Sequence, residues 1–214
     1  MPGLSREIAY FINVNPPDLA TQKKISAVLS ALDAKIELNT RINAELESLA
    51  KTLYDYWFVQ FAPHKSAGGE MVWNEELKRE IPLGWEVVKL GDCFEVKKGS
   101  LITEKTKENG LIKVVAGGLD FAYYHSEFNR DENTVTISGS GANAGFVNFW
   151  REKIFASDCT TVRGATDVET IIVYYYLKLM QKQIYRYSQG SAQPHVYPTD
   201  IKKSTIYLRP KKNL

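Results

Sequence analysis

The sequence has little cysteine and histidine and no long apolar run. Its two cysteines, Cys93 and Cys159, are far apart and form no CxxC pair, so the sequence predicts no metal-ligand cluster. Both thiols are expected to be reduced core residues. The longest apolar stretches, such as residues 171–176, fall far short of the ~18 residues that a membrane span needs. With no charged-then-apolar leader at its start, the sequence predicts a cytoplasmic protein without a membrane span.

Charge of one sign is also scarce, so composition alone does not indicate a nucleic-acid partner. The net charge is only +2. From residue 186 onward, however, the sequence contains six basic residues and a single acidic residue, Asp200. Such a run is either a modest basic patch or an ordinary solvated face, and the sequence leaves both open. The basic residues of this run are Arg186, Lys202, Lys203, Arg209, Lys211 and Lys212.

The first segment predicts a short strand followed by a helix. Residues 6–15 have the β-branched and aromatic composition of a strand, and Pro16 and Pro17 end it. Asp18 is suited to cap a helix, because its carboxylate accepts hydrogen bonds from the amides of the first turn. We therefore expect a helix to begin directly after Asp18.

From this point apolar or small residues recur at alternating steps of four and three, which is a heptad pattern. No Gly or Pro interrupts residues 19–62, so one helix of about 40 residues, roughly 60 Å long, is predicted. So long a stripe favours a partner helix, although a helix lying on its own domain stays open. Asn39 and Asn43 are expected to set register and orientation. This helix seam consists of Ile25, Leu29, Leu32, Ile36, Asn39, Asn43, Leu46, Ala50, Leu53 and Trp57.

Three parts are expected along the chain. A helical unit spans residues 1–62, and a composition rich in Pro, Ser and Gly predicts a linker over 63–80. The remainder, 81–214, alternates strand patterns with one helix, so the predicted fold class is α+β, a long coiled-coil helix followed by a mixed α/β domain. The predicted strands are residues 85–90, 93–97, 111–115, 134–138, 145–150, 154–155, 160–163 and 204–208.

One helix is predicted within the second unit. Thr166, with Glu169 three residues later, has the pattern of a capping box. An apolar face follows, and Gly190 is expected to end the helix. The residues of this face are Ile172, Tyr176, Leu179 and Ile184.

Two motifs with catalytic associations are discounted. Residues 15–17 match the start of the Asn-Pro-Pro-aromatic motif of adenine methyltransferases, but Asp18 replaces the aromatic residue that stacks on the flipped base. Residues 139–144 match a permissive dinucleotide-binding fingerprint, with Asp158 as the acid, yet a strand pattern follows where phosphate binding requires a helix. We expect a glycine-rich turn there and no catalytic residues. The alternative, an independent methyltransferase built on residues 15–17, predicts that the isolated chain binds S-adenosylmethionine.

Several stretches resemble the specificity subunits of Type I restriction-modification systems. They are residues 16–25, 32–39 and 53–61 of the long helix and its flanks, 81–92, and 190–201. The resemblance covers nearly the whole sequence, and it departs at Ala20 and Thr21, where the family usually has acidic residues. Such subunits usually hold two recognition domains and two spacer helices. With one of each, this sequence resembles half a subunit, natural or truncated.

The resemblance implies a DNA target-recognition domain that has no catalytic activity of its own. Antiparallel helices, from two copies or from this chain and another half-subunit, would hold two such domains on a split site in double-stranded DNA. A rod of roughly 60 Å limits the half-site separation to about 17 base pairs. The implied partners are modification subunits that methylate adenine with S-adenosylmethionine and a restriction subunit that uses ATP and Mg²⁺, and this chain is expected to hold no cofactor. The alternative is a homodimeric coiled-coil DNA-binding regulator without a methyltransferase partner.

Candidate DNA contacts are polar residues of predicted loops and basic residues near them. Lysines position phosphates, and polar side chains contact base edges in the major groove. Each of these positions is also compatible with an ordinary exposed polar residue, which is the commoner case. The candidates are Lys97, Lys98, Lys105, Lys107, Ser140, Asn143, Gln193, His195, Tyr197, Lys202 and Lys203.

Overall fold

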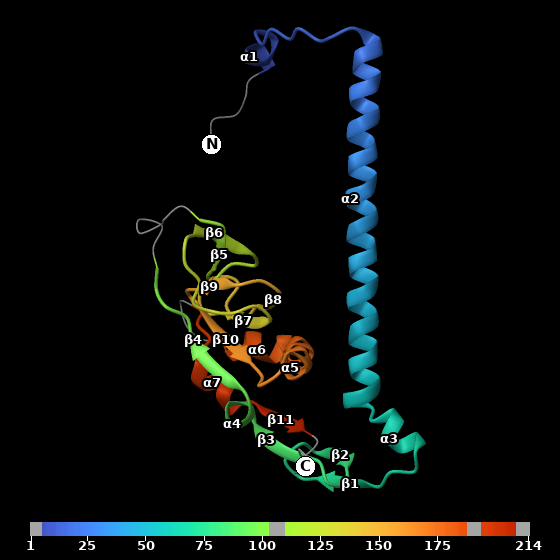
Figure 1. Ribbon diagram of the computed structural model, residues 1–214, viewed down its shortest axis with the longest axis vertical. Helices are drawn as coiled ribbons and strands as arrows, with labels where there is room; N and C mark the ends of the chain where they lie inside the picture. The colour runs from blue at the N-terminus through green and yellow to red at the C-terminus, as the bar shows by residue number, and fades with distance from the viewer. Residues whose placement is uncertain (1–5, 103–109, 188–193, 209–214) are drawn as a thin grey trace. The chain divides into compact units, whose positions relative to one another are not determined.

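The computed structural model describes residues 6–102, 110–187 and 194–208 (Figure 1). The chain divides into two units, Met1–Leu53 and Tyr54–Leu214, each of which is described by itself. The predicted α+β class is confirmed, because a long helix precedes a domain of strands and short helices.

The first unit begins with a short helix where a strand was expected. Helix α1 spans Arg6–Tyr10, so the prediction of a strand over residues 6–15 was wrong. A strand needs a neighbouring strand for its backbone hydrogen bonds, whereas a helical turn satisfies them locally. The Nε of Arg6 donates to the Tyr10 hydroxyl (3.2 Å), and the guanidinium lies 5.7 Å from the Tyr10 ring centroid. These contacts stabilise one helical turn.

Helix α2, Leu19–Tyr54, begins where the sequence predicted. Asp18 caps it: one carboxylate oxygen accepts the backbone N–H of Thr21 (2.9 Å), and the other accepts the Thr21 hydroxyl (2.8 Å). Hydrogen bonds from Thr21 hold the pKa of Asp18 below its ordinary value. The α-helix ends before the predicted residue 62, because the chain becomes π-helical over Asp55–Val59 (η1) and Phe61 then adopts a left-handed φ of 54°.

The segment expected to be a linker contains regular structure. Helix α3 spans Ala62–Ser66, and strands β1 (Met71–Asn74) and β2 (Arg79–Pro82) form an antiparallel hairpin. Partly buried residues of the hairpin pack on a cluster around Phe61 and Tyr207. The Arg79 guanidinium lies 5.2 Å from the centroid of the Phe61 ring and 5.6 Å from the centroid of the Tyr207 ring. Aromatic packing therefore orders a segment whose composition indicated a loop.

The strands of the second unit form three further sheets. A four-stranded antiparallel sheet has the order β4-β10-β7-β8, and a three-stranded sheet, β6-β5-β9, contains the parallel pair β5 and β9. Strands β11 and β3 pair with each other. All eight predicted strands overlap observed strands at nearly the same residues, whereas β1, β2 and β6 were not predicted. The bounds are β3 Glu86–Lys89, β4 Glu95–Lys98, β5 Ile112–Val115, β6 Phe121–His125, β7 Thr134–Ser138, β8 Val147–Trp150, β9 Ile154–Ala156, β10 Cys159–Arg163 and β11 Thr205–Leu208.

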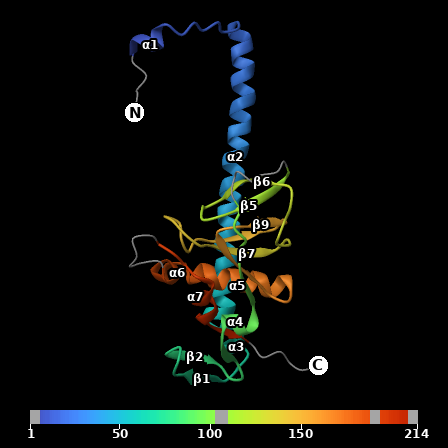
Figure 2. The same ribbon diagram turned by 90° about the vertical axis from the view of Figure 1, so that its left-hand side faces the viewer.

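Helices cover the four-stranded sheet. The predicted capping box starts α5, Asp167–Leu179, which packs on β10, β8 and β7. The chain does not continue as one helix to Gly190, which lies outside the described residues; instead α5 ends before Met180 and α6 spans Gln181–Tyr187 (Figure 2). The side chain of Gln181 donates to the Gly145 carbonyl oxygen (2.6 Å) and accepts the Val147 N–H (3.0 Å). The start of α6 is thereby joined to the sheet.

The two cysteines differ in environment. Cys159, on β10, is buried as predicted, and burial raises the pKa of its thiol to about 12. Cys93 is exposed, so its assignment to the core was wrong. Cys93 is the last residue of the short helix α4, Leu90–Cys93. The buried side of this turn is formed by Leu90 and by Phe94, four residues later, so Cys93 lies on the exposed side. None of the helices that the structure describes is long and apolar enough to cross a membrane.

Candidate nucleic-acid interface

One end of the four-stranded sheet gathers residues that are distant in sequence. Here β4 ends at Lys98, β7 ends at Ser138 and β10 begins at Cys159; we call these three strand ends and the turns that leave them the sheet end. The Gly99 N–H donates to the Cys159 carbonyl oxygen (2.8 Å). A Cβ on Gly99 would collide with the carbonyl oxygen of Ser157, so only glycine allows β4 to leave the sheet this close to its neighbour.

The glycine-rich segment after β7 is a turn, as the sequence predicted. Gly141 and Gly145 have φ values of 80° and 92°, which favour glycine. The Gly145 N–H donates to the Ser138 carbonyl oxygen (2.8 Å), and β8 follows at Val147. Because a strand and not a helix follows the glycines, no helix N-terminus is present there to bind a phosphate.

The segment before helix α7, Pro198–Lys203, lies beside this turn. His195 forms an isolated antiparallel bridge with Ser140, and the Val196 N–H donates to the Gly139 carbonyl oxygen (2.9 Å). The rings of His195 and Tyr197 stack with their centroids 5.9 Å apart, and Tyr197 is largely exposed. Three sequence-predicted contact residues, Ser140, His195 and Tyr197, are therefore brought together, with Asn143 half-buried in the same turn.

The predicted lysines separate into two groups. Lys97 and Lys98 are exposed on β4; Lys97 pairs with Glu95 (2.7 Å), and Lys98 lies at the sheet end. Lys202 and Lys203 are exposed at the C-terminal end of α7. This end packs closely on Gly91 of α4, because a Cβ added to Gly91 would lie only 2.8 Å from the Lys202 Cβ. Helix α4 precedes β4, so these two lysines lie at the opposite end of that strand. Lys105, Lys107 and Gln193 lie outside the described residues.

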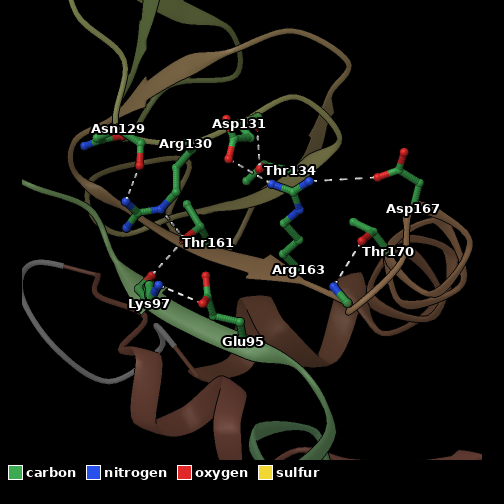
Figure 3. Close-up of polar contacts among 11 residues, drawn as sticks. Glu95, Lys97, Asn129, Arg130, Asp131, Thr134, Thr161, Arg163, Asp167 and Thr170 are labelled. Carbon is green, nitrogen blue, oxygen red and sulfur yellow. Dashed lines mark hydrogen bonds and ion pairs between the residues drawn. The ribbon is translucent and has the colours of Figure 1, made fainter.

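Two residues that the sequence did not single out, Asn129 and Arg130, help to hold the sheet end together. Figure 3 shows the Arg130 side chain bonded to the Asn129 carbonyl oxygen and to the Thr161 hydroxyl. The side chain of Asn129 donates to the Ala156 carbonyl oxygen (2.9 Å) and accepts the Ala156 N–H (2.7 Å). The guanidinium of Arg130 donates to the Thr161 hydroxyl (2.9 Å) and to the carbonyl oxygen of Lys98 (2.8 Å). Arg130 thus joins β4 to β10 through hydrogen bonds that no local pattern predicts. Arg130 is half-buried, and these bonds engage its guanidinium within the protein.

Asp158 is a further polar residue of the sheet end. It follows β9 and directly precedes β10, and its carboxylate accepts a hydrogen bond from the Ser140 hydroxyl. Its carbonyl oxygen accepts the Gly139 N–H (3.0 Å). The sequence indicated Asp158 only as the acid of a dinucleotide fingerprint, an interpretation that the turn excludes.

Across the described parts of the chain, no group of three or more His, Cys, Asp or Glu is arranged to hold a metal ion. The raised pKa of Cys159 keeps its thiol protonated at neutral pH, so it is no nucleophile there. The sheet end offers hydrogen-bonding groups, one stacked aromatic pair and charge.

The helix seam is a second candidate surface. Its large apolar residues expose between 49% and 64% of their surface in the single chain. Val28, Ile42 and Leu49 follow the same side of α2 one position before the seam and are exposed too, so the apolar face is wider than a two-helix seam requires. Asn39 and Asn43 are also exposed. Pairing through these residues stays a prediction.

Comparisons with known sequences give one consistent family. A family model described as the Type I restriction modification DNA specificity domain matches residues 10–48 and 82–213. The Type I restriction enzyme MjaIX specificity subunit of Methanocaldococcus jannaschii is 28% identical over 230 residues, which cover 98% of this chain and 53% of that protein. The HindI specificity subunit of Haemophilus influenzae is 44% identical over 62 residues, 29% of this chain and 14% of that protein.

Solved structures share the fold. The HsdS subunit from Thermoanaerobacter tengcongensis matches with a TM-score of 0.52 and 20% identity, covering 98% of this chain and 51% of that one. The S subunit of a Type I restriction-modification system from M. genitalium matches with a TM-score of 0.51 and 22% identity, over 60% of this chain and 35% of that one. The chain spans about half the length of the M. jannaschii and T. tengcongensis relatives. Since the family model matches well over half of its sequence, the chain belongs to the family of Type I restriction-modification DNA specificity domains.

Proposed function

We propose that the chain recognises a DNA sequence for a separate methyltransferase and catalyses no reaction itself. The observation that carries this proposal is the sheet end, where Ser140, His195 and Tyr197 meet at the same end of the sheet as the exposed Lys98. Lysine binds phosphates without regard to sequence, whereas hydroxyl, imidazole and phenol groups form hydrogen bonds with base edges. Family membership supports this function, because the matched domain is named for DNA specificity.

The proposal assigns the long helix to protein partners. A helix from another copy, or from a second half-subunit, would cover the helix seam in antiparallel orientation and place two recognition domains on a split target. The extra apolar positions of α2 would remain for a modification subunit, which would bind S-adenosylmethionine and methylate adenine. ATP and Mg²⁺ would belong to a restriction subunit. The 36 residues of α2 span roughly 54 Å, which limits the half-sites to about 16 base pairs apart.

The experiment that tests this function is methylation mapping. The purified chain is mixed with a Type I modification subunit from the same genome and S-adenosylmethionine, and methylated adenines are located in a random-sequence DNA library. Methylation confined to a split motif is expected. Sequence-specific DNA binding by the chain alone, with no complex and no methylation, would contradict the proposal and favour a regulator. Methylation by the chain without the modification subunit would show that the chain is an enzyme.

A pair of lysine variants tests which end of β4 faces DNA. Lys98→Gln is expected to weaken binding to all sequences alike and to lower the salt slope by about 1, the effect of one lost phosphate contact. Lys203→Gln, an equal change of charge at the opposite end, is the matched control and should leave both quantities unchanged. The reverse result would move the DNA surface to the end of β4 that carries Lys202 and Lys203.

A further inference from the structure

Asp158 holds a negative charge at a surface that the proposed function assigns to DNA. Repulsion from phosphates disfavours a carboxylate there unless it meets a hydrogen-bond donor of the DNA. The phosphate and sugar oxygens that line the backbone are acceptors, so the donors available in the major groove are the exocyclic amino groups of adenine and cytosine. An acid at this place therefore restricts the chemistry of its ligand more sharply than a lysine does.

Asp158 is half-buried, so the residue keeps some exposed surface at the sheet end. Two glycines adjoin it: a Cβ on Gly139 would lie 2.8 Å from one carboxylate oxygen, and a Cβ on Gly117 would lie 3.5 Å from the other. Any larger residue at Gly139 would press on the carboxylate. Within residues 6–102, 110–187 and 194–208, no lysine or arginine forms an ion pair with Asp158. Its charge is thus not neutralised by a described side chain of the protein.

The position of the carboxylate is also fixed. The Ser140 hydroxyl donates to it, and two backbone hydrogen bonds hold the chain at this point. The Ser157 N–H donates to the Val115 carbonyl oxygen (2.8 Å), and the Gly139 N–H donates to the carbonyl oxygen of Asp158 itself (3.0 Å). An ionised carboxylate has about four acceptor sites, and among the described residues the Ser140 hydroxyl occupies one of them. A preorganised acceptor with unused capacity is what base recognition requires.

We propose that Asp158, held by Ser140, is a specificity-determining residue that accepts a hydrogen bond from the amino group of an adenine or a cytosine in the target. This inference rests on the proposed function and goes beyond it, because it assigns one chemical class of base to one residue. Lys98, whose strand partner Thr160 lies two residues after Asp158, would contact the phosphate backbone beside that base.

The test repeats the methylation mapping with the full chain and its modification subunit. Asp158→Asn keeps the size of the side chain and an oxygen for Ser140 but adds N–H donors, so the preference at one base pair of the motif should be lost or changed by about 10-fold. All other positions should keep their preference. Ser140→Ala, which leaves the acid in place, should reduce the preference at that same base pair by a smaller factor. It serves as the independent probe where Asp158→Asn fails to assemble.

The control is Asp92→Asn, an equal change of charge on the exposed face of α4 at the opposite end of β4, which should leave the motif unchanged. A purely structural role of Asp158 would lower thermal stability and weaken every sequence alike without altering the motif. A wild-type motif that persists at every position in Asp158→Asn and Ser140→Ala overturns this inference and leaves the proposed function intact. Failure of the wild-type chain to give any motif overturns both.

Discussion

The two units use the same apolar residue types in opposite ways. Leu29 and Leu32 of α2 are more than half exposed, whereas Leu90 and Ile137 of the sheet unit are completely buried. In the sheet unit, side chains from strands and helices surround one another in a shared core. Helix α2 satisfies its own backbone but buries almost none of its apolar face. Most helical stability in proteins comes from packing of that face, so we expect α2 to depend on a partner more than the sheet unit does.

The largest effect is expected where α2 meets its partner. Leu32→Asp with Leu46→Asp places two charges in the helix seam, and burial of unpaired charges should weaken association of the chains by about 100-fold. Sedimentation equilibrium measures this change. Ala34→Asp with Ser48→Asp adds the same charges two residues further on, on the opposite side of the helix, and should leave association unchanged. A Leu32/Leu46 variant that is still fully associated would show that another surface is buried.

Truncation of one leucine to alanine in each unit tests whether apolar side chains contribute to stability in the sheet unit but not in α2. Leu90→Ala should cost about 3 kcal/mol of unfolding free energy, because it leaves a cavity in the core. In the monomeric Leu32→Asp/Leu46→Asp background, Leu29→Ala should change stability by less than about 0.5 kcal/mol, because no neighbour loses a contact. Urea unfolding is followed by tryptophan fluorescence for the sheet unit and by circular dichroism for α2. Equal losses would mean that α2 packs on the rest of its own chain.

The capping box of α5 is expected to have a smaller effect. Thr166→Ala removes the hydroxyl that accepts the Glu169 N–H (3.2 Å) and should cost about 1 kcal/mol. Thr166→Ser retains a hydroxyl and is the matched control. The midpoint of urea unfolding of the sheet unit reports the difference. An unchanged midpoint in Thr166→Ala would show that packing alone holds the start of α5.

The smallest effect is expected at the start of α2, and it depends on pH. Hydrogen bonds from Thr21 hold the pKa of Asp18 below its value in the unfolded chain. Its contribution is therefore fully present above the unfolded pKa and is lost as the pH falls through the lower, folded pKa. NMR titration of the Thr21 amide should show this acid transition in the wild type. Asp18→Asn keeps a capping oxygen without an ionisable group, so its Thr21 amide should not titrate.

The success of the sequence predictions followed the range of the interactions involved. The helix α2 and the caps at Asp18 and Thr166 were predicted correctly because their hydrogen-bond partners lie three or four residues away. The strand expected at residues 6–15 was wrong for the converse reason, since a strand needs a distant partner that this segment lacks among the described residues. In the sheet unit, the exposure of Cys93 and the break of the helix at Met180 likewise depended on contacts with other elements.

The candidate site was predicted only in part. The polar residues Ser140, His195 and Tyr197 were chosen from loops one at a time, and the structure brought them together. Asn129 and Arg130 carried no signal, because the carbonyl groups that they bind lie about 30 residues away along the chain. Asp158 was noticed for a motif that its surroundings rule out.

The sequence alone determined the long helix, its start, most strands and the family, since each depends on local periodicity or on matched stretches of residues. Only the tertiary structure decided that Lys98, Ser140, Asp158 and His195 meet at one end of a sheet and that Lys202 and Lys203 lie at the other. Strand order and register set these positions, and both depend on hydrogen bonds between residues far apart in the chain, which local periodicity does not encode.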